Sequence, residues 1–164
     1  MKKIIVFLCF VNVLLLVKND NNVFINNAIR YRIIVSDNSV ISQDLKWKIN
    51  SEIIPIINEM DSSSLEKMDK SIKDNLPIIE EVVKKYTNDY KINYGNNYFP
   101  EKKYHNVKYD AGYYPSLVIY LGKSSGNNWW CFMFPPLCTI EAQKDNLSDI
   151  EYDYYFKKII NKFI

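Results

Sequence analysis

Residues 126–138 read Gly-Asn-Asn-Trp-Trp-Cys-Phe-Met-Phe-Pro-Pro-Leu-Cys. The window holds two of the three tryptophans, two of the three cysteines and two of the six prolines of the chain. Its double proline cannot lie in a central strand, because proline has no backbone N–H to donate. Adjacent side chains of a strand point to opposite faces, so Trp129 and Trp130 cannot share one core. The window therefore predicts an aromatic strand over residues 129–134 that ends in a rigid proline corner.

The segments before this window predict helices in the first half of the chain. A strand over residues 28–36, rich in β-branched side chains, precedes a helix whose apolar residues recur every four positions from Ile41 to Ile53. Pro55 is expected to kink or end that helix, because proline removes one of its hydrogen bonds.

A second helix is predicted from the capping box that Ser63 forms with Glu66. Asn75-Leu76-Pro77 should break or kink this helix, and helical spacing continues beyond it to Tyr86.

Strands are predicted for the second half of the chain. Apolar and polar residues alternate over 90–94, residues 95–97 (Gly-Asn-Asn) should form a turn, and residues 117–122 form an apolar strand. The tail, residues 148–164, has the pattern of an amphipathic helix. This order predicts the α+β class, a single domain. We expect helices of the first half to pack on a small, mainly antiparallel sheet formed by an early strand and late strands.

The amino terminus has the layout of a secretory signal. Met1-Lys2-Lys3 precedes an apolar run over residues 4–17, which is short for a membrane-spanning helix of about 20 residues. An uncleaved amino-terminal anchor is one alternative, and a buried first element of a cytosolic protein is another. We expect residues 1–18 to direct export and residues 19–164 to form the single domain.

The charge balance argues against nucleic acid as a partner. The formal net charge of the 164 residues is +2, but without Lys2, Lys3 and Lys18 the remainder carries 18 basic and 19 acidic residues. Nucleic-acid binding needs a basic surface, and a nearly neutral domain without a basic stripe lacks one.

The cysteines predict a disulfide. If Cys9 leaves with the signal, Cys131 and Cys138 remain, and an even number in an oxidising compartment indicates pairing. Their spacing fits neither a Cys-x-x-Cys redox motif nor a zinc site, and His105 is the single histidine. Two buried thiols, or Cys131 as a nucleophile beside His105, are the alternatives. We expect no catalytic residue, cofactor or metal.

Several stretches together resemble one family, stage II sporulation protein R. The stretches that carry the resemblance are Asn128-Trp129-Trp130-Cys131, Phe134-Pro135-Pro136-Leu137-Cys138, Phe99-Pro100-Glu101-Lys102-Lys103-Tyr104, Ala111-Gly112-Tyr113-Tyr114, Ser36-Asp37, Gln43-Asp44-Leu45-Lys46 and Asn75-Leu76-Pro77. The likeness covers about residues 29–141. Ser124 departs from it, since the family has a glycine at that place, and Ser42 stands where an aspartate is usual.

The resemblance implies an exported intercellular signal of sporulation. Proteins of this family pass from the forespore into the space between the forespore and mother-cell membranes. There they activate a membrane-embedded peptidase that processes the sigma-E precursor. On this reading the chain is an activator of a protease without catalysis of its own, and it acts close to the membrane through its partner or an uncleaved anchor.

Partner binding is expected at the two most specific stretches. They contain Trp129, Trp130, Phe99, Pro100 and Lys102. Aromatic and proline residues give a rigid contact surface at a low entropic cost, and no charged constellation of the sequence competes with them. One tryptophan should belong to the core and the other should contact the partner.

Two other classes of function stay open on the sequence alone. One is an exported cysteine-dependent cell-wall hydrolase, which would use Cys131 and His105. The other is an aromatic-rich wall- or glycan-binding module.

Overall fold

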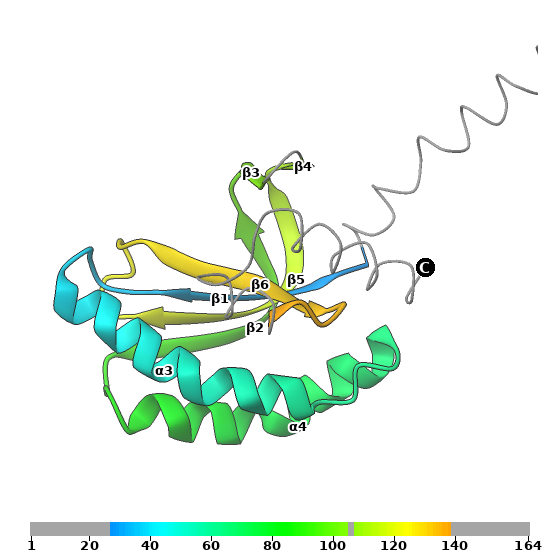
Figure 1. The fold of residues 1–164 in the computed structure, drawn as a ribbon, viewed down its shortest axis with the longest axis horizontal. Helices are drawn as coiled ribbons and strands as arrows, with labels where there is room; N and C mark the ends of the chain where they lie inside the picture. Colours follow the sequence, from blue (N-terminus) through cyan, green and yellow to red (C-terminus); the bar gives the residue numbers. More distant parts are fainter. Residues whose placement is uncertain (1–26, 105–106, 139–164) are drawn as a thin grey trace, which may run out of the picture.

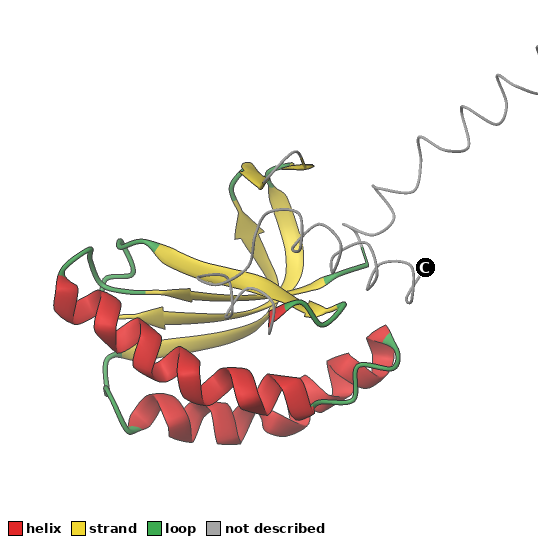
Figure 2. Ribbon diagram, in the orientation of Figure 1, coloured by secondary structure: helices red, strands yellow, loops and turns green. Residues whose placement is uncertain are grey.

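The computed structural model of the protein describes residues 27–104 and 107–138, which form one α+β domain. Its elements in chain order are β1 (Ile29–Ile34), α3 (Val40–Glu59), α4 (Leu65–Lys84), β2 (Tyr90–Phe99), β3 (Lys102–Tyr104), β4 (Val107–Tyr109), β5 (Gly112–Leu121) and β6 (Asn128–Phe134). The expected fold class is confirmed, with both helices ahead of all strands but the first (Figure 2).

The sheet has the strand order β2-β5-β1-β6. Its central pair, β1 with β5, is parallel, whereas β6 pairs with β1 and β2 pairs with β5 in antiparallel fashion. The sheet is therefore mainly antiparallel, as expected, with one early strand among late ones. Both helices cover one face, while the β3–β4 hairpin stands on the opposite side (Figure 1).

The hydrophobic core lies between the sheet and the helices. β1 alternates, so that Tyr31 and Ile33 face the helices and are fully buried. They pack with Ile49 and Ile53 of α3 and with Ile72 of α4. The face of the sheet without helices is called the open face below.

Helix α3 begins after Ser39, whose side chain accepts a hydrogen bond from the Ser42 N–H at 3.2 Å. The expectation that Pro55 ends the helix is wrong, because α3 continues to Glu59. Pro55 lies on the exposed side of α3, where water can satisfy the carbonyl that loses its intrahelical partner. Ile54 and Ile57, on the buried side, hold the last turn against the core.

Helix α4 differs from its prediction at both points that the sequence marked. The cap is Ser64, not Ser63, because the Ser64 hydroxyl accepts from the Lys67 N–H at 3.2 Å, while the Ser63 hydroxyl binds Asp61. Pro77 does not break the helix, which runs on to Lys84 with Pro77 on its exposed side.

The predicted turn at residues 95–97 is also wrong, since β2 runs from Tyr90 to Phe99 without interruption. The Asn97 side chain explains the difference, because its amide nitrogen donates to the Ser116 carbonyl and hydroxyl of β5 at 3.1 and 3.0 Å. The chain reverses later, through the β3–β4 hairpin.

Two predicted segments lie outside the described residues: the signal or anchor over 1–18 and the amphipathic helix over 148–164. Neither helix within residues 27–104 and 107–138 is long and apolar enough to cross a membrane.

Candidate partner-binding site

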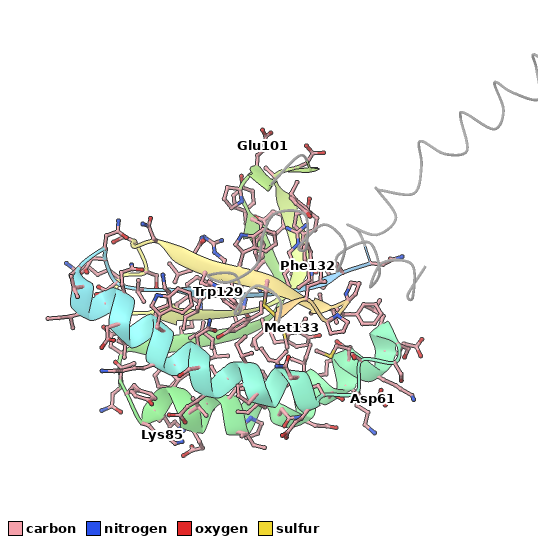
Figure 3. The ribbon with its side chains drawn as sticks, viewed as in Figure 1. Asp61, Lys85, Glu101, Trp129, Phe132 and Met133 are labelled. Atoms are coloured by element: carbon pink, nitrogen blue, oxygen red, sulfur yellow. A yellow bond between two sulfur atoms is a disulfide. The ribbon has the colours of Figure 1, made fainter. Side chains whose placement is uncertain are left out.

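Strand β6 places its two tryptophans on opposite faces of the sheet, as the alternation of a strand requires. Trp129 and Met133 pack against the core between the sheet and the helices, while Phe132 lies on the open face (Figure 3). Trp130 shares the open face with Phe132, their ring centres 5.3 Å apart.

Trp129 is a packing residue of the helix side. Its ring contacts Tyr31 edge-on at 5.7 Å and Trp47 of α3 at 6.4 Å between ring centres. Trp47 is 50% exposed, so the pair forms the rim of the core. Trp129 thus joins β6 to α3.

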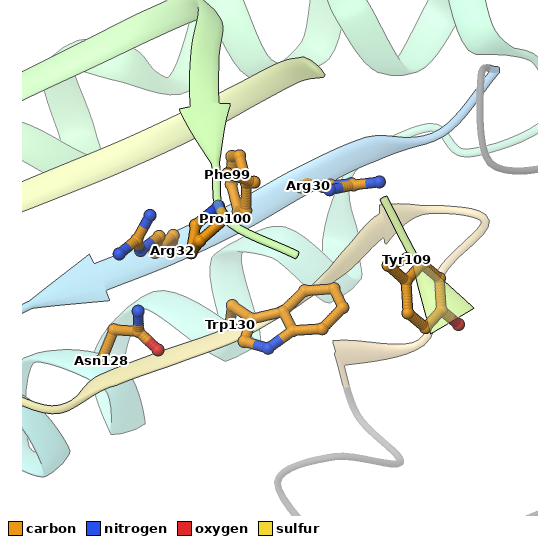
Figure 4. Close-up of a pocket in the computed structure, with 7 residues that line it drawn as sticks. All are labelled: Arg30, Arg32, Phe99, Pro100, Tyr109, Asn128 and Trp130. Atoms are coloured by element: carbon orange, nitrogen blue, oxygen red, sulfur yellow. The ribbon is translucent and has the colours of Figure 1, made fainter. Parts of the chain in front are cut away.

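A hollow opens on the other face of the sheet, beside Trp130. It has a volume of about 30 Å³. Its lining residues are Arg30, Arg32, Phe99, Pro100, Tyr109, Asn128 and Trp130 (Figure 4). We call this feature the Arg30 hollow. It joins β1, the end of β2, β4 and β6, which are far apart in the sequence.

Arg30 is buried at the base of the hollow with an exposed fraction of 2%. Its guanidinium carbon lies 3.4 Å from the centre of the Tyr114 ring and 5.1 Å from that of Phe99. Three further rings, those of Tyr109, Trp130 and Phe132, lie within 6.0 Å of the same atom. Aromatic faces attract a cation, so this ring of side chains stabilises the charge in part.

The edge of the Arg30 guanidinium has donors that the rings do not satisfy. Its Nε and Nη2 atoms are buried and have no hydrogen-bond partner. Burial lowers the pKa of Arg30, while Tyr114 and Tyr109 act in the opposite direction. Arginine remains protonated even so, because the ordinary pKa of a guanidinium lies far above neutral pH.

Arg32 lies two residues further along β1 and faces the same hollow. The hydrogen-bonding network orients the Asn128 amide with its oxygen toward Arg32, where it accepts from Nε at 3.0 Å and Nη2 at 2.8 Å. The guanidinium carbon of Arg32 is 5.3 Å from the centre of the Phe99 ring. Phe99 therefore separates the two cations of the hollow.

The family profile described as stage II sporulation protein R matches residues 25–144, which include the whole Arg30 hollow. The chain belongs to the stage II sporulation protein R family. Stage II sporulation protein R of Bacillus subtilis (strain 168) is 33% identical over 134 residues, a match that covers 76% of this chain and 59% of the relative. The chain thus spans about three fifths of that relative's length. No solved structure matches the chain.

The loop that follows β1, which contains the Ser36-Asp37 stretch of the family resemblance, is hydrogen-bonded to the loop before β6. The Gly126 N–H donates to the Val35 carbonyl at 2.9 Å, and the Asn127 N–H donates to the Asn38 side chain at 2.6 Å. Gly126 tolerates no side chain, because a Cβ there would lie 2.2 Å from the Asp37 carbonyl oxygen. These contacts fix the start of β6 and so the place of Asn128 in the hollow.

The same two loops receive a buried lysine from α3. The Lys46 ammonium, 4% exposed as a residue, donates to the Gln43 side chain at 2.5 Å and to the Asn127 carbonyl at 3.3 Å. Burial lowers the pKa of Lys46. Gln43 and Lys46, which belong to the stretch that resembles the family, thus stabilise this end of the sheet.

The other end of β6 carries the proline corner, where the Phe134–Pro135 peptide bond is cis. The Leu137 N–H donates to the Phe132 carbonyl at 3.0 Å, and a disulfide joins Cys131 to Cys138 with 5.0 Å between their Cα atoms. Both cysteines are buried. In this state Cys131 has no free thiol, and its proposed catalytic partner His105 lies outside the described residues.

The structure brings together only some of the residues that the sequence nominated for partner binding. Phe99, Pro100 and Trp130 line the Arg30 hollow, whereas Trp129 faces the helices. Lys102 begins β3, and its side chain lies outside the described part of the chain.

The aromatic residues of the hollow surround two arginines that the sequence did not nominate. Arg30 and Arg32 stand at alternate positions of β1, between the apolar residues 29, 31 and 33. Charged residues that alternate with apolar ones are the ordinary pattern of a strand with one solvated face, so the pattern of β1 does not reveal that Arg30 is buried. No metal-binding group of three or more His, Cys, Asp or Glu residues occurs among the residues that the structure describes.

Proposed function

We propose that this protein is an exported intercellular signal of sporulation that activates a membrane-embedded peptidase, which then processes the sigma-E precursor. The chain would act by binding, through the open face of its sheet. Membership of the stage II sporulation protein R family supports the link to sporulation.

One observation of the structure carries the proposal. The two stretches with the strongest family resemblance, one around Phe99-Pro100 and one around Asn128–Trp130, meet in the Arg30 hollow. Tyr109 and Trp130 contact each other across it, with ring centres 5.8 Å apart. Binding energy of protein interfaces concentrates in aromatic and arginine residues that surround small pockets. The hollow therefore has the composition of a contact site.

The disulfide supports action outside the cytoplasm. Disulfides persist in oxidising compartments and are rare where cellular thiols keep cysteines reduced. The bond of Cys131 with Cys138 also favours the binding reading over the cysteine-dependent hydrolase, because it occupies the thiol that such an enzyme would need.

The test is reconstitution in a bacterial host that does not sporulate. The chain, the cognate peptidase and the sigma-E precursor are co-expressed, and conversion of the precursor is followed by immunoblot. We expect conversion only when all three proteins are present. Equal conversion without the chain would overturn the proposal.

A matched binding assay separates this function from the wall-binding alternative. The exported protein is incubated with purified peptidoglycan and, separately, with membranes that contain the peptidase. Retention on peptidase-containing membranes, but not on peptidoglycan or on membranes without the peptidase, is the expected result. Retention on peptidoglycan alone would favour the glycan-binding module.

A further inference from the structure

We propose that the Arg30 hollow is a carboxylate-binding site, and that its ligand is an acidic side chain on the exposed face of the peptidase. This inference rests on the proposed function, which it deepens by naming the chemistry of the contact.

The first step concerns the geometry of the Arg30 guanidinium. A guanidinium is planar, and its N–H bonds point outward in that plane. The Tyr114 and Phe99 rings bind the cation by their π systems, but a ring face is no full substitute for a hydrogen-bond acceptor. Nε and Nη2 therefore remain two donors on one edge, both buried and without an acceptor, so that a ligand reaches them only if the surrounding side chains move aside. Two adjacent donors on one edge match the two oxygens of a carboxylate.

The second step concerns the charge. Within residues 27–104 and 107–138, no ion pair joins Arg30 or Arg32 to a carboxylate. Two cations thus face one small hollow with neutral aromatic and amide groups around them. A buried, unpaired cation is unfavourable, and an arriving anion relieves this penalty. The site is therefore ready for a negative ligand before the partner arrives.

The third step concerns size and the rim. The hollow has a volume of about 30 Å³, so only a small group can occupy its base. Pro100 and Trp130 supply rigid apolar walls, which exclude water from an ion pair at the base. Asn128 holds Arg32 by two hydrogen bonds, so that the second cation stays directed at the hollow. An acidic side chain flanked by apolar neighbours fits this arrangement.

The decisive variant is Arg30→Met, because methionine keeps an unbranched stem and removes the charge. Removing a buried unpaired charge should leave the thermal midpoint unchanged or raise it. Sigma-E processing in the reconstituted host should fall at least tenfold. The matched control is Lys91→Met, which removes an exposed positive charge from β2, outside the hollow, and should leave processing unchanged.

Three results would count against this inference or against the proposed function. Full processing by the Arg30→Met variant would overturn the inference while leaving the proposed function intact. A thermal midpoint that falls in step with processing would assign Arg30 a structural role and also overturn it. If wild-type chain gives no processing at all, the proposed function fails, and the titration described next still decides whether a carboxylate site exists.

The direct measurement is a titration of the exported, isotope-labelled protein followed by NMR. The probe is N-acetylaspartate amide, and N-acetylasparagine amide is its neutral match. We expect saturable shifts of the Arg30 Nε–H and Trp130 indole signals with the acid alone, weakened ten- to hundredfold in Arg30→Met, since hydrogen bonds to charged groups have this magnitude. Equal shifts with both probes, or no shift, would contradict a carboxylate site.

Acidic residues of the chain's own tail are the second conceivable source of a carboxylate. A full-length variant in which Glu141, Asp145, Asp149, Glu151 and Asp153 become the corresponding amides tests this source. Equal affinity of this variant and the wild type for the acidic probe supports an external ligand. Binding by the variant alone would show that the tail fills the site, and would overturn the assignment to the peptidase.

Discussion

Arg30 and Tyr31 are neighbours in β1, and both bury polar atoms that lack a hydrogen-bond partner. They point to opposite faces of the sheet, so their surroundings differ. Arg30 lines a hollow that a ligand can enter, whereas the Tyr31 hydroxyl lies within the core and is fully buried. Burial alone raises the pKa of Tyr31. A polar group without a partner can bind a ligand on the open face, whereas on the helix side it only destabilises the fold.

Tyr31→Phe should therefore raise the free energy of unfolding by about 1 kcal/mol, because the variant no longer buries an unpaired hydroxyl. Urea unfolding of both proteins at the same pH measures the difference. Phenylalanine keeps the aromatic ring, so the edge-on contact with Trp129 is retained and the packing is the same in both proteins. A loss of stability instead would reveal an acceptor for the Tyr31 hydroxyl.

The two tryptophans make a second pair with opposed expectations. Trp129→Ala removes a ring that packs on Tyr31 and Trp47, and should lower the free energy of unfolding by about 3 kcal/mol. Trp130→Ala opens a wall of the Arg30 hollow and should reduce sigma-E processing by more than its loss of stability explains. Thermal melting and the processing assay are run on both variants. If processing follows stability in the same way for the two, the contact role of Trp130 is wrong.

Elements are joined on the helix side by a carboxylate between α4 and β2. Asp69 accepts hydrogen bonds from Lys73 at 2.6 Å and from the Tyr94 hydroxyl at 2.8 Å. The contact with Lys73, followed by that with Tyr94, lowers the pKa of Asp69. A lowered carboxyl pKa contributes stability above the unfolded value of about 4 and loses it as the pH falls through the folded value.

Asp69→Asn should accordingly be less stable than the wild type at pH 6, and the difference should shrink as the pH falls from about 4 toward 2. Thermal midpoints across that range measure it. Tyr94→Phe removes one of the two hydrogen-bond donors to Asp69. The part of the stability that depends on pH should therefore be smaller in Tyr94→Phe than in the wild type, but not zero. A difference that stays constant with pH would mean that Asp69 acts through packing and not through its charge.

The disulfide ties the middle of β6, at Cys131, to the segment that follows the proline corner. Replacing both Cys131 and Cys138 by serine should lower the free energy of unfolding by about 2 kcal/mol, the value expected for so short a loop. Reduction of the wild type should have a similar effect, which chemical denaturation with and without reductant would show. No change on reduction would mean that the bond does not form in the exported protein.

Much of the fold could be predicted from local patterns. The β-branched run of β1, the apolar run of β5 and the aromatic run of β6 each gave the correct element, because period and composition agreed there. Neither Pro55 nor Pro77 ends its helix, since a proline on the solvent side of a helix loses one hydrogen bond that water replaces. The turn expected at residues 95–97 is absent, and the Asn97 side chain there bonds to Ser116 of β5, a strand that comes later in the chain.

The candidate site was only half visible in the sequence. Phe99, Pro100 and Trp130 could be predicted, because they belong to short stretches rich in aromatic residues and proline. Arg30 and Arg32 were missed, since nothing local shows that the face of β1 opposite the helices is covered by aromatic rings. Those rings come from β2, β4, β5 and β6, and only the strand order brings them to Arg30.

The whole molecule has to leave the producing cell if the proposed function is correct. The basic and apolar start over residues 1–18 motivates this expectation. A chain without these residues, retained inside the producing cell, should give no sigma-E processing in a sporulating culture. Fitting an unrelated secretory signal in place of residues 1–18 should restore it. Full processing by the retained form would contradict the need for export.

The strand order has a consequence for the timing of folding. Among the described residues β1 is the first strand to be synthesised, yet its two neighbours, β5 and β6, follow only after both helices and β2. Contacts so distant along the chain give a high contact order, and slow, late closure of the sheet. Until β5 and β6 are synthesised, β1 lacks the two strands that flank it in the sheet. If the protein is exported as proposed, this late closure of the sheet would favour passage through a channel that accepts only unfolded chains.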